Sequence, residues 1–230
     1  MNTYGEKGFM SYMTYQNAAQ ELSEAKYNFI IGAALTWGFG LNYLLLRFAG
    51  PMLIHLVYGA GMLPFLIAYF VLVMIGNGLV RSYDPVKCFI GYNLIAVPVG
   101  IVAMTATLGY DPTLVVRAVL CTAVVTLSMM IVSMIFPQFF TRLAPALGVA
   151  LFAVVIVQLG AALFFRADLT ILDWVVVGVM SLYVGYDWVR ANSVQRTVTN
   201  AIAAASALYL DIINIFLRLL RILARSRSDD

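Results

Sequence analysis

The sequence predicts an all-α integral membrane protein with about seven transmembrane helices. The 230 residues are 63% hydrophobic and 11% charged, with a mean hydropathy of +0.92, whereas soluble domains are roughly 45–50% apolar and about 25% charged. The apolar residues also gather in long stretches that are separated by connections of only a few residues. Because the connections are short, neighbouring helices are expected to pack antiparallel in one compact bundle.

Each predicted span is a stretch of about 20 mostly apolar residues, the length that a transmembrane helix needs. In chain order the spans are Asn28–Phe48, Met52–Gly78, Cys88–Leu108, Thr113–Phe136, Leu143–Phe165, Thr170–Arg190 and Asn200–Leu223. Acidic residues lie in or beside the gaps between them, namely Asp84, Asp111, Asp168 and Asp173. The spans make up one transmembrane domain, residues 28–224, between an N-terminal tail, 1–27, and a charged C-terminal tail, 225–230.

The orientation follows from the basic residues in the short loops, which favour the cytoplasmic side. They are concentrated in the second, fourth and sixth connections, at Arg81, Lys87, Arg142, Arg190 and Arg196. This places the N-terminus in the cytoplasm, and its polar first 27 residues do not read as a cleavable signal peptide. Seven spans would put the arginine-rich C-terminus outside, whereas a re-entrant last helix would keep both ends in the cytoplasm. The compact chain with short tails favours a bacterial plasma membrane.

Several other kinds of site are excluded by composition. Cys88 and Cys121 both fall within predicted spans, so neither a disulfide nor a zinc site is expected. His55 is the single histidine, which excludes a histidine-based metal site. The net charge of +3 is distributed along the chain, without the basic block that would indicate nucleic-acid binding. We expect no organic cofactor and no enzymatic activity.

Asp187 and Asp211 are the candidate functional residues, because they are the acidic residues embedded in predicted spans. An ionisable group at bilayer depth is costly and usually faces a protein interior or a water path. The midpoint between the two is residue 199, inside the polar connection 191–200. Antiparallel packing therefore places both carboxylates at a similar depth in the cytoplasmic half, at most ~18 Å from the turn at a rise of ~1.5 Å per residue. Facing each other is allowed by this geometry.

The last predicted helix carries a polar stripe that suits the centre of a bundle. Asp211, Asn214, Arg218 and Arg221 recur at steps of three and four residues and so share one helix face. The segment AIAAASA at residues 201–207 is a run of small residues, which lets neighbouring helices approach closely.

Two close carboxylates in a low-dielectric setting cannot both ionise easily and titrate in two coupled steps, which makes them a proton sensor. When both are ionised they form a hard-oxygen site suited to Ca²⁺, with backbone carbonyls, Asn214 or water completing the shell. The alternative is purely structural. In it Asp187 pairs with Arg190, three residues on, and Asp211 pairs with Arg218.

The C-terminal third resembles the Bax-inhibitor (transmembrane Bax inhibitor motif) family, in its bacterial form. The matching segments are SLYVGYDWV at Ser181–Val189 and ALYLDIINIFLRLLRIL at Ala207–Leu223. The resemblance implies a seven-helix bundle with the last helix central, and a pH-sensitive Ca²⁺ leak in which Asp187 and Asp211 are the sensing pair. It also implies that Arg81 can latch onto Asp187. The second span lacks the glutamate that some members carry there.

Three rival functions stay open. The first is an intramembrane aspartyl protease, which also uses two aspartates in adjacent spans, and Tyr186–Asp187 fits one half of the protease motif. The other half does not fit, because Asp211 lacks the Gly-x-Gly that precedes the second aspartate in these proteases. The triplet Pro145–Leu147 also precedes both aspartates, whereas the corresponding triplet of the proteases follows them. A regulatory or scaffolding protein would use the aspartates only to hold its helices together. A proton-coupled transporter would carry protons on the same pair. The expected partners are the bilayer, Ca²⁺ and protons.

Overall fold

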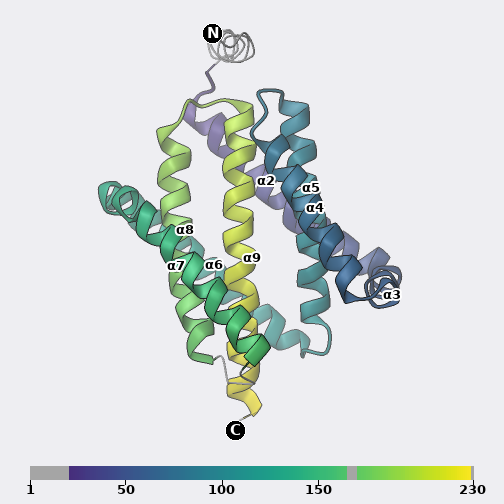
Figure 1. The fold of residues 1–230 in the computed structure, drawn as a ribbon. Helices are drawn as coiled ribbons and strands as arrows, with labels where there is room; N and C mark the ends of the chain where they lie inside the picture. Colours follow the sequence, from purple (N-terminus) through teal and green to yellow (C-terminus); the bar gives the residue numbers. More distant parts are fainter. Residues whose placement is uncertain (1–20, 165–169, 229–230) are drawn as a thin grey trace, which may run out of the picture. The chain divides into compact units, whose positions relative to one another are not determined.

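The computed structural model describes residues 21–164 and 170–228, and this part of the chain is helical, without a strand. Figure 1 follows the helices from α2 in purple to α9 in yellow. In chain order they are α2 (Glu24–Leu44), the π-helix η1 (Leu45–Ala49), α3 (Gly50–Ala60), α4 (Met62–Val80), α5 (Pro85–Thr107), α6 (Pro112–Ile135), α7 (Pro137–Phe164), α8 (Thr170–Ser193) and α9 (Val198–Ser228). The predicted all-α membrane class is confirmed.

Six of the described helical segments are long and apolar enough to cross a membrane. They are Glu24–Leu53, Leu63–Val80, Pro85–Thr107, Pro112–Ile135, Pro137–Gln158 and Ile171–Ser193. The predicted seventh span, Asn200–Leu223, lies within α9, which is 31 residues long but is not among the six. No residue from Val198 to Arg225 is exposed.

The boundary between the first two spans differs from the sequence prediction, which placed it between Phe48 and Met52. The first helix instead continues through η1 into α3, and the break falls at Gly61. Pro51 is the second residue of α3 and follows the π-helix η1 closely, and the helix continues past it. Gly61 has φ +82°, a backbone conformation that favours glycine, and it therefore ends the helix.

The chain divides into two compact units, each described by itself. The first comprises residues 1–101 and 194–206. Its helices are tied by the Tyr92 hydroxyl, which donates to the Ala34 carbonyl at 2.8 Å, and by Trp37 Nε1, which donates to Asn93 Oδ1 at 2.9 Å. Cys88 is a buried free cysteine here, whereas Cys121 of the second unit is an exposed free cysteine.

The second unit comprises residues 102–193 and 207–230, and it holds α6, α7, α8 and most of α9. Helix α8 packs against both α6 and α7. A small apolar core forms where Leu114 and Ala118 of α6 meet Leu220 of α9. The unit therefore holds both α8 and the part of α9 that carries the polar stripe. The predicted N-terminal tail up to residue 20, together with Arg166, Asp168, Asp229 and Asp230, lies outside the described residues.

Candidate functional site

Helices α8 and α9 are joined by a short turn whose polar side chains form hydrogen bonds with the first residues of α9. The Thr197 hydroxyl accepts a hydrogen bond from the Asn200 backbone N–H at 3.2 Å, as a residue capping a helix N-terminus does. The Asn200 side-chain amide donates to the Gln195 carbonyl at 2.8 Å. These bonds fix where α9 begins, and the start of the helix sets the register of every residue that follows in it.

The structure brings Asp187 of α8 and Asp211 of α9 together, so that their carboxyl groups lie close enough to interact with each other. Two carboxyl groups share a hydrogen bond only when one of them holds a proton, because an ionised carboxylate can only accept. Asp187 is half-buried and Asp211 is buried. The Oδ2 atom of Asp211 accepts no hydrogen bond from any described residue. A hydrogen bond between these two carboxyl groups would therefore require one proton on the pair.

The neighbours of the pair include one residue that the sequence analysis did not single out. Tyr183 lies one helical turn before Asp187 and is close enough to interact electrostatically with both carboxyl groups. Its signal in the sequence was the four-residue spacing from Asp187, which places both side chains on one face of α8. Arg190 is exposed and its charge acts on Asp187. The Asn214 amide donates to the Leu210 carbonyl of its own helix at 2.9 Å.

Arg81, the predicted latch for Asp187, is the exposed residue that ends α4 in the first unit. Asp187 belongs to the second unit. The proposed engagement of the two residues therefore stays a prediction.

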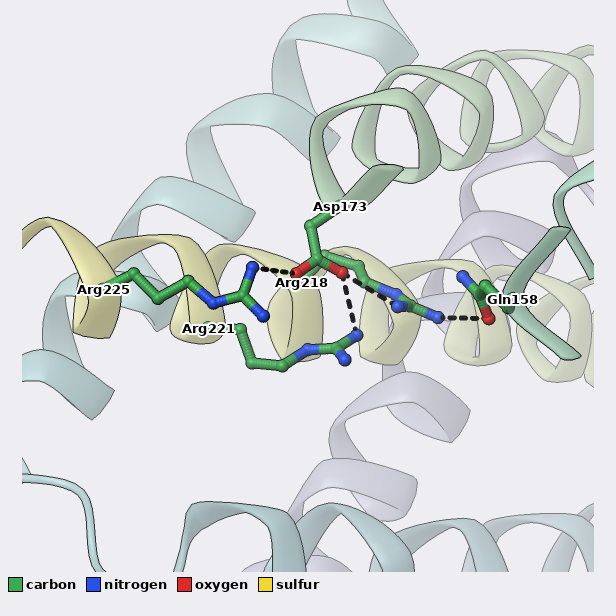
Figure 2. Close-up of polar contacts among 5 residues, drawn as sticks. All are labelled: Gln158, Asp173, Arg218, Arg221 and Arg225. Atoms are coloured by element: carbon green, nitrogen blue, oxygen red, sulfur yellow. Dashed lines mark hydrogen bonds and ion pairs between the residues drawn. The ribbon is translucent and has the colours of Figure 1, made fainter. Parts of the chain in front are cut away.

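A second polar cluster, which we call the arginine cluster, lies fourteen residues along α8 from Asp187 and is shown in Figure 2. Asp173 is fully buried, and its Oδ1 accepts from Arg218 Nη1 at 2.9 Å and contacts Arg221 Nη2 at 3.0 Å. Its Oδ2 accepts from Arg225 Nη1 at 3.4 Å. Arg218 also donates from Nη2 to Gln158 Oε1 of α7 at 3.1 Å. This cluster ties α7, α8 and α9 together.

The arginine cluster corrects one sequence interpretation. Arg218 was weighed as a partner for Asp211, but the structure pairs it with Asp173. Seven residues separate Arg218 from Asp211 along α9, about 10 Å of axial rise, so the two side chains point to different depths. The sequence signal for the contact between Asp173 and Arg225 is that both lie equally far from residue 199, at the centre of the hairpin connection.

Helix dipoles favour the same arrangement. Asp173 lies in the first turn of α8, and Arg225 lies in the last turn of α9. Acidic side chains are stabilised near helix N-termini and basic side chains near C-termini. The ion pair and the two helix ends therefore support each other.

A further ion pair, outside the spans, joins the loop before α6 to the end of α9. Arg227 Nη1 donates to Asp111 Oδ2 at 2.7 Å. Asp111 also caps α6, because its Oδ1 accepts from the Thr113 N–H at 2.8 Å and from the Thr113 hydroxyl at 2.7 Å. The hydrogen bonds from Thr113, and then the one from Arg227, lower the pKa of Asp111 to about 2.

Among the residues that the structure describes, no group of three or more His, Cys, Asp and Glu side chains is placed to hold a metal ion. The Asp187–Asp211 pair alone offers two carboxyl groups, fewer ligands than the six to eight oxygens that Ca²⁺ takes.

Comparison with models of protein families identifies the family of the chain. The model of the family described as "Inhibitor of apoptosis-promoting Bax1" matches residues 9–228, nearly the whole chain. No curated protein sequence matches significantly.

Proposed function

Because the chain belongs to the Bax inhibitor family, we propose that this membrane protein is a pH-sensitive leak that passes Ca²⁺ down its gradient. The observation that carries the proposal is the close approach of the Asp187 and Asp211 carboxyl groups, with Asp211 buried. A proton shared by the two groups would join neighbouring membrane helices, so the state of one proton is coupled to the packing of α8 against α9. Neither residue is placed as a catalyst in this proposal, and the protein is not an enzyme.

The gating step follows from the shared proton. With the proton present, the two carboxyl groups are bound to each other and hold α8 and α9 together at this depth. Loss of the proton leaves two negative charges in a low-dielectric setting, and they repel each other. The carboxylates then separate, and Asp187 is released towards a cation or towards Arg81. Ca²⁺ flux is therefore expected to rise as the pH rises.

The test is Ca²⁺ entry into liposomes containing the purified protein, measured at several pH values with a trapped indicator. Asp187→Asn and Asp211→Asn both keep a side chain that can hydrogen-bond but abolish the titratable pair. Asp111→Asn is the matched control, because it makes the same chemical change at an exposed loop residue. We expect the pH dependence to disappear in the first two variants and to persist in the control. Flux no greater than that of empty liposomes in every case would overturn the leak.

The same observation favours one alternative, in which the pair carries protons across the membrane in exchange for Ca²⁺. The two functions differ in stoichiometry, because an exchanger must move protons against the Ca²⁺ current and a leak need not. A pH-sensitive dye trapped in the same liposomes separates them. A proton flux that follows Ca²⁺ entry and is abolished by Asp211→Asn would identify the exchanger. We place the protein in a bacterial plasma membrane with its N-terminus in the cytoplasm.

A further inference from the structure

The arginine cluster brings more positive charge to one place than its carboxylate balances. Arg218 and Arg221 both bind Asp173 Oδ1, so two guanidinium groups already share one negative charge before Arg225 is included. Each guanidinium carries five N–H donors, and a carboxylate oxygen accepts about two hydrogen bonds. Asp173 is fully buried and its two oxygens are occupied by these contacts. The cluster therefore keeps both positive charge and hydrogen-bond donors that Asp173 cannot satisfy.

Gln158 adds a neutral donor to the same place. Its Oε1 accepts the hydrogen bond from Arg218, as Figure 2 shows, and this orients the amide beside the guanidinium. Its Nε2 is buried and donates to no described residue. A buried donor without an acceptor is costly, and such a group normally has a partner. A further acceptor beside Arg218 would satisfy it.

The cluster is also accessible from one side. The side chain of Arg218 is 16% exposed, whereas that of Arg221 is 37% exposed. Asp173 is the third residue of the candidate span Ile171–Ser193, so it lies at one end of that span. The ends of spans lie at the depth of the lipid headgroups. The accessible guanidinium N–H groups are thus at the level where phosphate groups of lipids are found.

We propose that Arg218, Arg221 and Gln158 form a binding site for the phosphate group of an anionic phospholipid. Arginine forks match phosphate oxygens in a bidentate manner, which makes arginine the side chain that most often recognises a phosphate group. In this site Arg221 contacts the phosphate from the exposed side, and the Gln158 amide donates to it from the buried side. Asp173 holds the arginines in position. The site does not depend on the Asp187–Asp211 pair or on ion flux.

Arg227 provides the contrast that makes the proposal testable. It lies on the same helix, six residues after Arg221, and is 58% exposed, but it is paired one-to-one with Asp111 at 2.7 Å. Arg221→Gln and Arg227→Gln each remove one positive charge from the same end of α9. If lipid binding depends on general attraction to a negative membrane surface, both variants should lose the same amount of binding. If it depends on a specific site, only Arg221→Gln should lose binding.

The experiment measures lipid binding to the purified full-length protein in detergent by native mass spectrometry, with phosphatidylglycerol and phosphatidylcholine added separately. We expect the wild type to prefer phosphatidylglycerol. Arg221→Gln should weaken that binding about fivefold, the value of one arginine near a charged headgroup, and Arg227→Gln should leave it unchanged. Arg221→Lys keeps the positive charge that faces Asp173 and should lose less phosphatidylglycerol binding than Arg221→Gln. This variant therefore separates the loss of the lipid contact from a defect in folding. Circular dichroism and size-exclusion chromatography establish that each variant is folded.

Two results would overturn the proposal. One is equal binding of the two lipids by the wild type. The other is an equal loss in Arg221→Gln and Arg227→Gln, which would indicate general surface charge. A parallel measurement of the thermal midpoint in inorganic phosphate against chloride, at equal ionic strength, separates the sources of phosphate. A shift in phosphate without preferential lipid binding would identify a free-anion site and refute the lipid as the ligand.

Discussion

Asp173 and Arg225 contact each other across the α8–α9 hairpin, with 3.4 Å between Asp173 Oδ2 and Arg225 Nη1. Each lies 26 residues from Thr199, and Asp187 and Asp211 each lie 12 residues from the same position. One antiparallel register therefore accounts for both contacts. The acidic pair and the arginine cluster are separated by about 21 Å along the same two helices. Any movement of α9 against α8 at one site must be accommodated at the other.

Asp173→Asn is expected to destabilise the protein strongly. The substitution leaves Arg218, Arg221 and Arg225 without the buried charge they share. Removing one partner of a buried ion pair costs about 3–5 kcal/mol, because the remaining charge is left uncompensated. The free energy of unfolding can be measured by denaturant titration in mixed micelles. Asp111→Asn is the control, and its effect should be much smaller because its ion pair is exposed. Equal losses in the two variants would contradict this account.

The hairpin register and the pair it brings together could be predicted from the sequence. Both followed from the length of the connection and from the embedding of Asp187 and Asp211 in apolar stretches. The partner of Arg218 could not be assigned in the same way. Helical periodicity places Arg218 on the stripe of Asp211, but the choice of partner depends on how α8 is rotated, and apolar sequence on all faces of a span leaves that rotation unspecified.

The end of the first span was mispredicted for a local reason. Gly50 and Pro51 together are a strong breaking signal in a soluble protein. Here the π-helix η1 immediately precedes Pro51, and the helix continues past the proline into α3. The break lies at Gly61, between Gly59 and Pro64 in the sequence. Hydropathy cannot show whether the break lies at Gly50 or at Gly61, because both glycines lie in apolar sequence.

Gly91→Ala should destabilise the first unit. A Cβ atom on Gly91 would lie 2.6 Å from the Val80 nitrogen and 2.7 Å from the Gly76 carbonyl oxygen, so α4 and α5 would have to move apart. Overpacking of this kind costs about 1–3 kcal/mol. The control is Gly78→Ala, where the added Cβ meets nothing within 4 Å. That variant should be neutral or slightly stabilising, since alanine is the better helix former. Thermal midpoints of the two variants in detergent test the contrast.

Replacing Asp211 by asparagine and by leucine should have different effects on stability. Asparagine can still donate a hydrogen bond to Asp187, so the link between α8 and α9 is kept. Leucine cannot, and it leaves the Asp187 carboxyl group without its partner. The loss of a buried hydrogen-bond partner costs about 1–3 kcal/mol. Asp211→Leu should therefore unfold at a lower denaturant concentration than Asp211→Asn. Identical stabilities would mean that the hydrogen bond contributes nothing.

Asp111 gives the protein a pH dependence that is separate from the acidic pair. Hydrogen bonds from Thr113 and the Arg227 guanidinium hold its pKa at about 2 in the folded protein, against about 3.9 for an unperturbed aspartate. A group whose folded pKa is depressed contributes stability above its unfolded pKa, and the contribution is lost as the pH falls through the folded pKa. The ionised Asp111 therefore stabilises the fold at neutral pH, and this effect declines below about pH 4.

The comparison is between the thermal midpoints of the wild type and Asp111→Ala from pH 7 down to pH 2. The difference should be constant between pH 7 and pH 5, shrink below about pH 4 and be smallest near pH 2, where the unfolded state is protonated and the folded state is about half protonated. Arg227→Gln should reproduce only part of the difference, because the hydrogen bonds from Thr113 to Asp111 remain. A difference that widens on acidification would require a group with the opposite shift, and it would remove Asp111 as the cause.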